Sequence, residues 1–112
     1  MIPDSDLARI KRWAEDRIPE HARDQVWIGL DVADRAITIL ECRPLWNPDR
    51  SGHDPTRLPI ARLRYTKSRR EWSLYWRDRN SRFHTYELAK PSAAVTDLLE
   101  EIDLDRTGIF WG

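Results

Sequence analysis

The sequence predicts an α+β domain in which a five-stranded, mainly antiparallel sheet carries an N-terminal and a C-terminal helix on one face. Two regions, residues 25–42 and 60–86, contain short runs in which apolar and polar side chains alternate, as they do in half-buried strands. Near both ends of the chain, apolar residues instead recur every three or four positions, as in amphipathic helices. Helices and a sheet with one apolar face each are expected to bury those faces together.

Residues 4–18 have the pattern of the first helix. Asp4 or Ser5 can cap its first turn, and Pro19 cannot continue it. Its apolar stripe consists of Leu7, Ile10, Ala14 and Ile18, with Trp13 at the edge. We expect this stripe to face the core.

Residues 25–33 and 36–42 have the pattern of two strands joined by a turn at residues 34–35. Pairing residue 33 with residue 36 places Leu30 opposite Ile39 and Ile28 opposite Glu41. A carboxylate on an apolar face needs a partner. Arg43 lies on the same side of the strand and is expected to pair with Glu41, and a catalytic acid is the alternative role for Glu41.

Residues 43–59 are expected to form a long Pro-rich loop within the domain. Four prolines interrupt regular structure there: Pro44, Pro48, Pro55 and Pro59. A loop of this length in a small domain is uncommon and often functional, and a disordered insertion is the alternative. Trp46 favours some order, and His53 beside Asp54 could act as an oriented general base.

Three further strands are expected near residues 60–66, 71–77 and 82–87. Pairing Tyr65 with Trp72, and Arg77 with Arg82, sets the register of these strands. The apolar face then holds Leu63, Tyr65, Trp72, Leu74, Trp76 and Phe83. The opposite face holds Arg62, Arg64, Tyr75, Arg77, Arg82, His84 and Tyr86.

Residues 91–104 are expected to form the final helix, opened by Pro91 and Ser92. Its apolar residues, at helical spacing, are Val95, Leu98, Leu99 and Ile102. The apolar segment 108–112 follows. We expect it to dock on the core as a short edge strand, and a hook for a partner is the alternative.

The length of 112 residues indicates one domain spanning residues 1–112. Basic and acidic residues balance at 19 each, but residues 57–86 carry nine Arg and Lys against Glu71 and Asp78, a net charge of +7. Residues 87–105 carry six acids against Lys90, a net charge of −5. The acidic segment could neutralise the basic strands within the fold, or the basic surface could stay clear for a partner.

A single cysteine, Cys42, allows no internal disulfide. With no apolar run near 18 residues and no signal peptide, the chain is expected to be cytoplasmic and to have no contact with membranes. The sequence has no GxGxxG, P-loop, HExxH or GxSxG motif, and its cysteine and histidines lack the spacing of a metal site. We therefore expect no metal and no cofactor.

The polar face of the three central strands is the leading candidate site. Arginines beside flat aromatic rings suit phosphates and stacked bases. Like charges placed directly opposite in a sheet are destabilising, so Arg77 opposite Arg82 would need an anion or a carboxylate between them. Pairing of these arginines with Glu71, Glu87, Asp78 or the acidic helix is the structural alternative.

Several blocks of this sequence are distinctive. They are Glu-Cys-Arg-Pro at 41–44, Pro-Ile-Ala-Arg-Leu-Arg-Tyr-Thr-Lys at 59–67, Tyr-Trp-Arg-Asp-Arg-Asn at 75–80, Arg-Phe-His at 82–84 and Ile-Phe-Trp-Gly at 109–112. With its tryptophans, the chain resembles a family of small bacterial single-domain proteins known only as a domain of unknown function. The resemblance implies one complete domain and brings no activity, cofactor or catalytic residue.

The first functional hypothesis is a non-enzymatic binding module whose preferred ligand is single-stranded RNA or DNA. The second is a protein-interaction module in which the same face, the 43–59 loop or the C-terminal tail meets an acidic partner. The third is a small enzyme that uses Glu41, His53 or His84. An exposed edge strand could also pair two copies into a homodimer.

Overall fold

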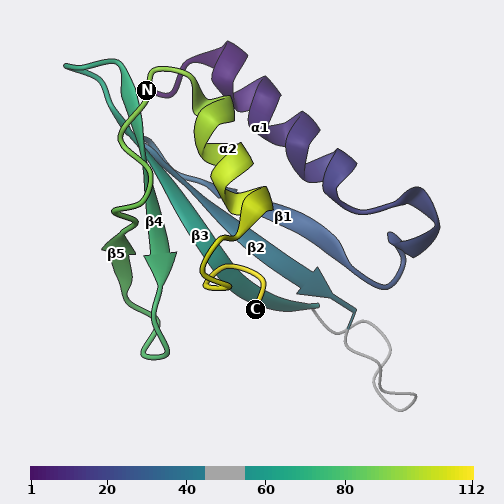
Figure 1. Cartoon of the computed structure of the whole chain (residues 1–112). Coiled ribbons are helices and arrows are strands. Elements are labelled where there is room, and N and C mark those ends of the chain that lie inside the picture. Colours follow the sequence, from purple (N-terminus) through teal and green to yellow (C-terminus); the bar gives the residue numbers. More distant parts are fainter. Residues whose placement is uncertain (45–54) are drawn as a thin grey trace.

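The computed structural model describes residues 1–44 and 55–112. Two helices pack on one face of a five-stranded antiparallel sheet whose strands pair in chain order. This arrangement confirms the predicted fold class (Figure 1). The elements are α1 (Asp4–Arg17), a 3-10 turn (Glu20–Ala22), β1 (Trp27–Val32), β2 (Ala36–Arg43), β3 (Thr56–Thr66), β4 (Glu71–Arg77), β5 (Phe83–Thr85) and α2 (Val95–Leu104).

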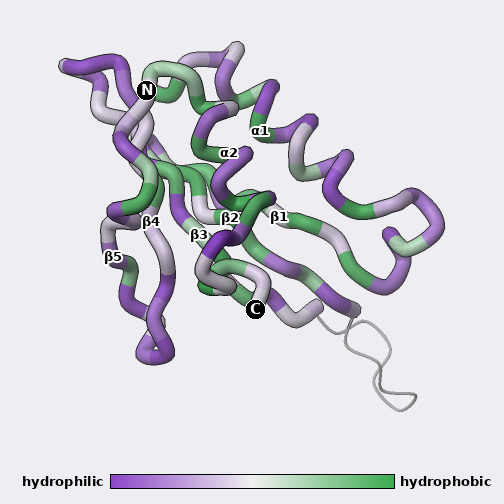
Figure 2. Tube along the Cα trace, in the orientation of Figure 1, coloured by the Kyte–Doolittle hydropathy of each residue, from purple (hydrophilic) through white to green (hydrophobic). Residues whose placement is uncertain are grey.

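The core lies between the sheet and the two helices, which cover the same face (Figure 1). Along the trace in Figure 2, apolar positions of both helices turn toward the sheet and polar ones turn away. Trp72 of β4 is fully buried, and its indole N–H donates to Asp6 of α1 over 2.9 Å. Trp13 of α1 donates to Asp103 of α2 over 3.0 Å. These bonds satisfy the polar end of each indole; the first ties α1 to the sheet and the second ties the two helices together.

The β1–β2 hairpin has the predicted register, with Leu30 opposite Ile39 and Ile28 opposite Glu41. The next strand differs from the expectation, because β3 begins at Thr56 and includes Pro59, the last residue of the expected 43–59 loop. Between Ile39 and Leu40 the pairing shifts so that Leu40 faces Pro59 while Ile39 faces Ala61. A bulge leaves one residue of the longer strand unpaired, and a proline is tolerated beside such an irregularity.

The β4–β5 pairing differs from the expected register by one residue. Arg77 faces Phe83 and Trp76 faces His84, whereas Arg77 was expected to face Arg82. The turn is one residue longer than expected, because Asp78 and Arg82 still form a backbone hydrogen bond and residues 79–81 make the loop. Ser81 takes a positive φ of 67°, as three-residue hairpin loops require near their end. A slip of one residue moves every side chain of β5 to the other face.

Helix α2 begins at Val95, four residues later than expected. Ser92 forms an isolated bridge with Trp72 of β4, so the chain pairs once more with the sheet before the helix starts. Ser92 then organises the start of the helix, since its hydroxyl donates to Asp97 over 2.8 Å and accepts from the backbone amide of Ala94 over 3.1 Å.

The C-terminal tail docks on the core, as expected, but it forms no strand. Phe110 is buried and packs on Tyr86 with ring centroids 5.0 Å apart. The Asp105 carboxylate accepts the backbone amides of Phe110 and Trp111, each over 2.9 Å. Through these contacts the tail covers the core beside Tyr86 and the end of α2.

Candidate functional site

The face of the sheet opposite the helices is covered by none of the described helices (Figure 1). We call it the open face. Alternation along the paired strands assigns to it Trp27, Gly29, Asp31, Ala36, Thr38, Leu40, Cys42, Arg57, Pro59, Arg62, Arg64, Thr66, Glu71, Ser73, Tyr75, Arg77, Phe83 and Thr85. Its central row runs across all five strands from Asp31 through Thr38, Arg62 and Tyr75 to Thr85.

Four of the seven predicted site residues lie together on the open face: Arg62, Arg64, Tyr75 and Arg77. The other three do not. The one-residue change of register turns His84 and Tyr86 toward the helix side, where Tyr86 is buried and His84 stacks on Trp76 at 4.7 Å. Arg82 closes the turn and faces Asp78, so the expected pair of opposed arginines does not exist.

Arg62 is held in the centre of the open face by two contacts. Its Nε donates to the Thr38 hydroxyl over 3.0 Å, and its guanidinium lies 4.0 Å from the centroid of the Phe83 ring. A guanidinium over an aromatic face is attracted by the ring quadrupole. Sequence reasoning assigned Phe83 to the core and missed this contact, because it depends on the length of the β4–β5 turn.

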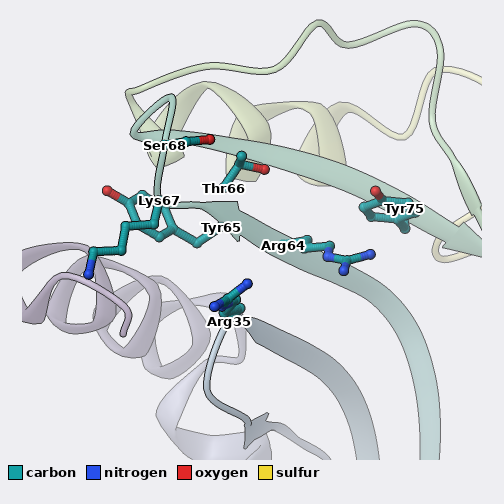
Figure 3. A pocket seen from close by; sticks show the side chains of 7 residues that line it. All are labelled: Arg35, Arg64, Tyr65, Thr66, Lys67, Ser68 and Tyr75. Carbon is teal, nitrogen blue, oxygen red and sulfur yellow. The ribbon is translucent and has the colours of Figure 1, made fainter.

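Arg64 borders a hollow of about 700 Å³ at the end of the open face, where the β1–β2 and β3–β4 turns lie side by side (Figure 3). Its lining consists of Arg35, Arg64, Tyr65, Thr66, Lys67, Ser68 and Tyr75. In Figure 3 the Arg64 side chain extends from β3 in the direction of Tyr75, and Arg35 comes from the neighbouring turn. No carboxylate is among these lining residues.

Arg35 lines this hollow, although the sequence predicts it only as part of a turn. Its carbonyl oxygen accepts the backbone amide of Tyr65 over 2.7 Å, which ties the β1–β2 turn to the edge of β3. This hydrogen bond extends the β2–β3 pairing one residue beyond Ala36, the first residue of β2. It therefore places Arg35 beside the hollow. The two-residue turn at residues 34–35, combined with the pairing of β2 and β3, is the feature of the sequence that could have placed Arg35 near Tyr65.

The arginines of the open face form no ion pair within the described residues. Ion pairs in those residues join other groups, among them Arg17 with Asp103 and Arg106 with Glu101. The acidic helix α2 packs on the opposite side of the sheet, so it does not neutralise the basic strands through contact. Two acids do share the open face, Asp31 and Glu71, and neither pairs with Arg62, Arg64 or Arg77 in this part of the chain.

The β4–β5 turn forms a second polar cluster, centred on Asp78. Its carboxylate accepts the backbone amides of Asn80 and Arg82 and lies 2.6 Å from His84 Nε2. The hydrogen bond with His84, followed by the bond from the Arg82 amide, lowers the pKa of Asp78 from its ordinary value of 3.8 to about 2. Arg77 donates to the Ser81 hydroxyl in the same turn. These bonds fix the end of the open face where Arg77 lies.

The secondary candidates give no assembled active site in the described residues. Glu41 pairs with Arg43 over 3.2 Å, as expected. It lies on β2, separated from His84 on β5 by two strands. Trp46 and His53 lie outside the described residues. Within residues 1–44 and 55–112, no three His, Cys, Asp or Glu side chains group in a way that could hold a metal ion.

The fold and the site define this chain as a small α+β protein with an antiparallel meander, helices on one face and an arginine-rich opposite face. It belongs to the family described as Domain of unknown function (DUF3024), whose model matches residues 2–112. No curated protein and no solved structure matches the chain. In the part of the chain that the structure describes, no helix has the length and apolar character needed to cross a membrane.

Proposed function

We propose that this protein is a non-enzymatic binding module that holds single-stranded RNA or DNA on the open face. The observation that carries the proposal is the group Arg62, Arg64, Tyr75 and Arg77, which lie on one uncovered face with no carboxylate partner among the described residues. Guanidinium groups placed beside an aromatic ring suit a chain of phosphates and bases. A cytoplasmic location, with the free Cys42 kept reduced, is part of this proposal.

The sheet sets the spacing of these groups. Neighbouring strands lie about 4.8 Å apart, and residues two apart on one strand lie about 6.8 Å apart. Arg62 and Arg64 on β3 and Arg77 on β4 therefore present charges at intervals comparable to successive phosphates of an extended strand. Tyr75, directly opposite Arg62, offers a ring for one base. Stacking of this kind tolerates every base, so little sequence preference is expected.

The test compares the affinity of the wild type for a fluorescent single-stranded 12-mer with that of an Arg64→Glu/Arg77→Glu variant. The matched control is Lys11→Glu/Arg12→Glu, which makes the same change of charge on exposed positions of α1. We expect the open-face variant to lose at least tenfold in affinity and the control to lose much less. Each phosphate contact to a single strand contributes about 0.7 to the slope of log affinity against log salt, so two lost contacts should reduce the slope by about 1.4.

If both variants lost affinity equally, the binding would depend only on the overall charge of the protein, and the proposal would be contradicted. A capture experiment from cell lysate separates the other class of partner. Nuclease-sensitive RNA or DNA that is lost with the open-face variant supports the proposal. A nuclease-resistant acidic protein lost with the same variant would replace it with the protein-interaction hypothesis.

A further inference from the structure

We infer that the hollow beside Arg64 binds a phosphomonoester, the terminal phosphate of a strand that lies on the open face. The inference rests on the proposed function and adds a second recognition site to it. The hollow lies at one end of the open face, between the turns that follow β1 and β3 (Figure 3). A strand that crosses the sheet toward this end would bring its last nucleotide to it.

The charges that line the hollow fit a dianion. Arg35, Arg64 and Lys67 supply three cations, and the hydroxyl groups of Thr66 and Ser68 supply two further donors. A phosphodiester inside a strand carries one negative charge, whereas a terminal phosphomonoester carries close to two near neutral pH and three strong acceptor oxygens. Two guanidinium forks are the groups best suited to such oxygens, because they donate in pairs within one plane.

The polar groups around the hollow leave its cations available. Among residues 1–44 and 55–112, Arg35 forms one long ion pair, with Asp34 at 3.9 Å, and both side chains are largely exposed. Arg64 forms no ion pair within the described residues. Glu71 lies across the ladder from Thr66 on the same face, but it is not part of the lining. In Figure 3 the Lys67 side chain extends toward α1, and its exposed, flexible stem can turn back toward a bound anion.

The size of the hollow and the position of Tyr75 suit a whole terminal nucleotide. Binding sites for small ligands generally occupy about 300 to 1,000 Å³, and this one occupies about 700 Å³. Tyr75 forms its border toward the centre of the open face, so a base stacked on that ring would place its own phosphate beside Arg64. The same ring would then join the terminal site to the row of arginines.

The experiment measures the affinity of one 12-mer sequence in three forms: with a 5′-phosphate, with a 3′-phosphate and with neither. One of the phosphorylated forms should bind about tenfold more tightly than the unphosphorylated form, as one additional charge-assisted contact provides. Arg35→Gln/Lys67→Gln should abolish this increment and leave the affinity for the unphosphorylated strand nearly unchanged. The matched control is Arg69→Gln/Arg79→Gln, which removes two exposed cations from turns without touching the lining.

The outcomes separate this inference from the proposed function. Binding of all three forms with equal affinity, or an increment that survives in Arg35→Gln/Lys67→Gln, overturns the terminal-phosphate site and leaves the open face as the binding surface. A further arm uses a nucleoside 5′-monophosphate and inorganic phosphate. If these bind through Arg35 while no 12-mer binds, the phosphomonoester chemistry is supported and the nucleic-acid platform is contradicted. If no probe binds, both proposals fail.

Discussion

Arg62 shows how a charged side chain becomes a fixed part of a surface. The Thr38 hydroxyl of β2 accepts its Nε–H, and the Phe83 ring of β5 lies beneath its guanidinium, so contacts from two other strands hold it in place. Its charge is therefore oriented before any ligand arrives, and binding needs to order fewer side-chain torsions. Arg64 is exposed and has no such contacts with the residues that the structure describes.

Replacement of Phe83 tests this orientation. Phe83→Ala should weaken binding of single-stranded nucleic acid several-fold, because a cation–π contact at a partly exposed site contributes about 0.5 to 1 kcal/mol. Anisotropy titration measures the affinity. Thr85→Ala, on the same strand and the same face, is the control and should change it little. An unchanged affinity in Phe83→Ala would show that Arg62 needs no support from the ring.

The pH dependence of the β4–β5 turn follows from the lowered pKa of Asp78. Because the pKa is lower in the folded protein than in the unfolded chain, the carboxylate stabilises the fold above pH 3.8, and this contribution is lost as the pH falls toward about 2. NMR spectra recorded from pH 5 to pH 2 should therefore show the Asn80 and Arg82 amides shifting with an apparent pKa near 2. An Asp78→Asn variant should lack this transition, and a midpoint near 3.8 in the wild type would contradict the structure.

At the scale of elements, the β1–β2 hairpin depends on a close approach at Gly29. A Cβ at this position would lie 2.9 Å from Cys42 Sγ on the paired strand, which is closer than side-chain atoms normally approach. Cys42 is itself buried, so it has little space into which to move. The close approach of Cys42 explains why glycine, which has no side chain, occurs at position 29 in the middle of β1.

Gly29→Ala should therefore destabilise the protein by about 1 to 3 kcal/mol, as overpacked buried sites do. Urea unfolding measures the loss. The double variant Gly29→Ala/Cys42→Ala should recover most of it, because the second substitution removes the sulfur atom that the new methyl group meets. Additive losses in the two substitutions would show that the strand conformation of Gly29, and not this contact, sets the cost.

At the scale of the whole molecule, the acidic helix α2 and the arginine-rich strands lie on opposite sides of one sheet. The acids of α2 bond to groups on the helix side, as Asp103 does to Trp13 and Glu101 does to Arg106, while the open face keeps its arginines. A chain with no net charge can thus present a basic surface, which a calculation over the whole sequence conceals. The meander also leaves β1 and β5 at the two edges of the sheet. Pairing of two copies through such an edge remains a prediction.

Much of the architecture could be predicted from local patterns. The alternation of residues 25–42 and 60–77 determined two strand pairs with their registers, β1–β2 and β3–β4, because a slip of one residue would have exposed the core side chains. Helical spacing determined α1 almost to the residue and the buried stripe of α2. The pairing of Glu41 with Arg43 followed from their positions on one strand.

The sequence by itself therefore determined the fold class, the order of the elements and the presence of an arginine-rich face. Only the tertiary structure decided which side chains share that face. The conformation of Ser81 set the length of one turn, which moved His84 and Tyr86 away and brought Phe83 to Arg62. The junction of two turns brought Arg35 to Arg64. The periodicity of the sequence indicates only which face of its own strand a residue lies on. The contacts between strands depend in addition on turn geometry and on residues distant in the chain.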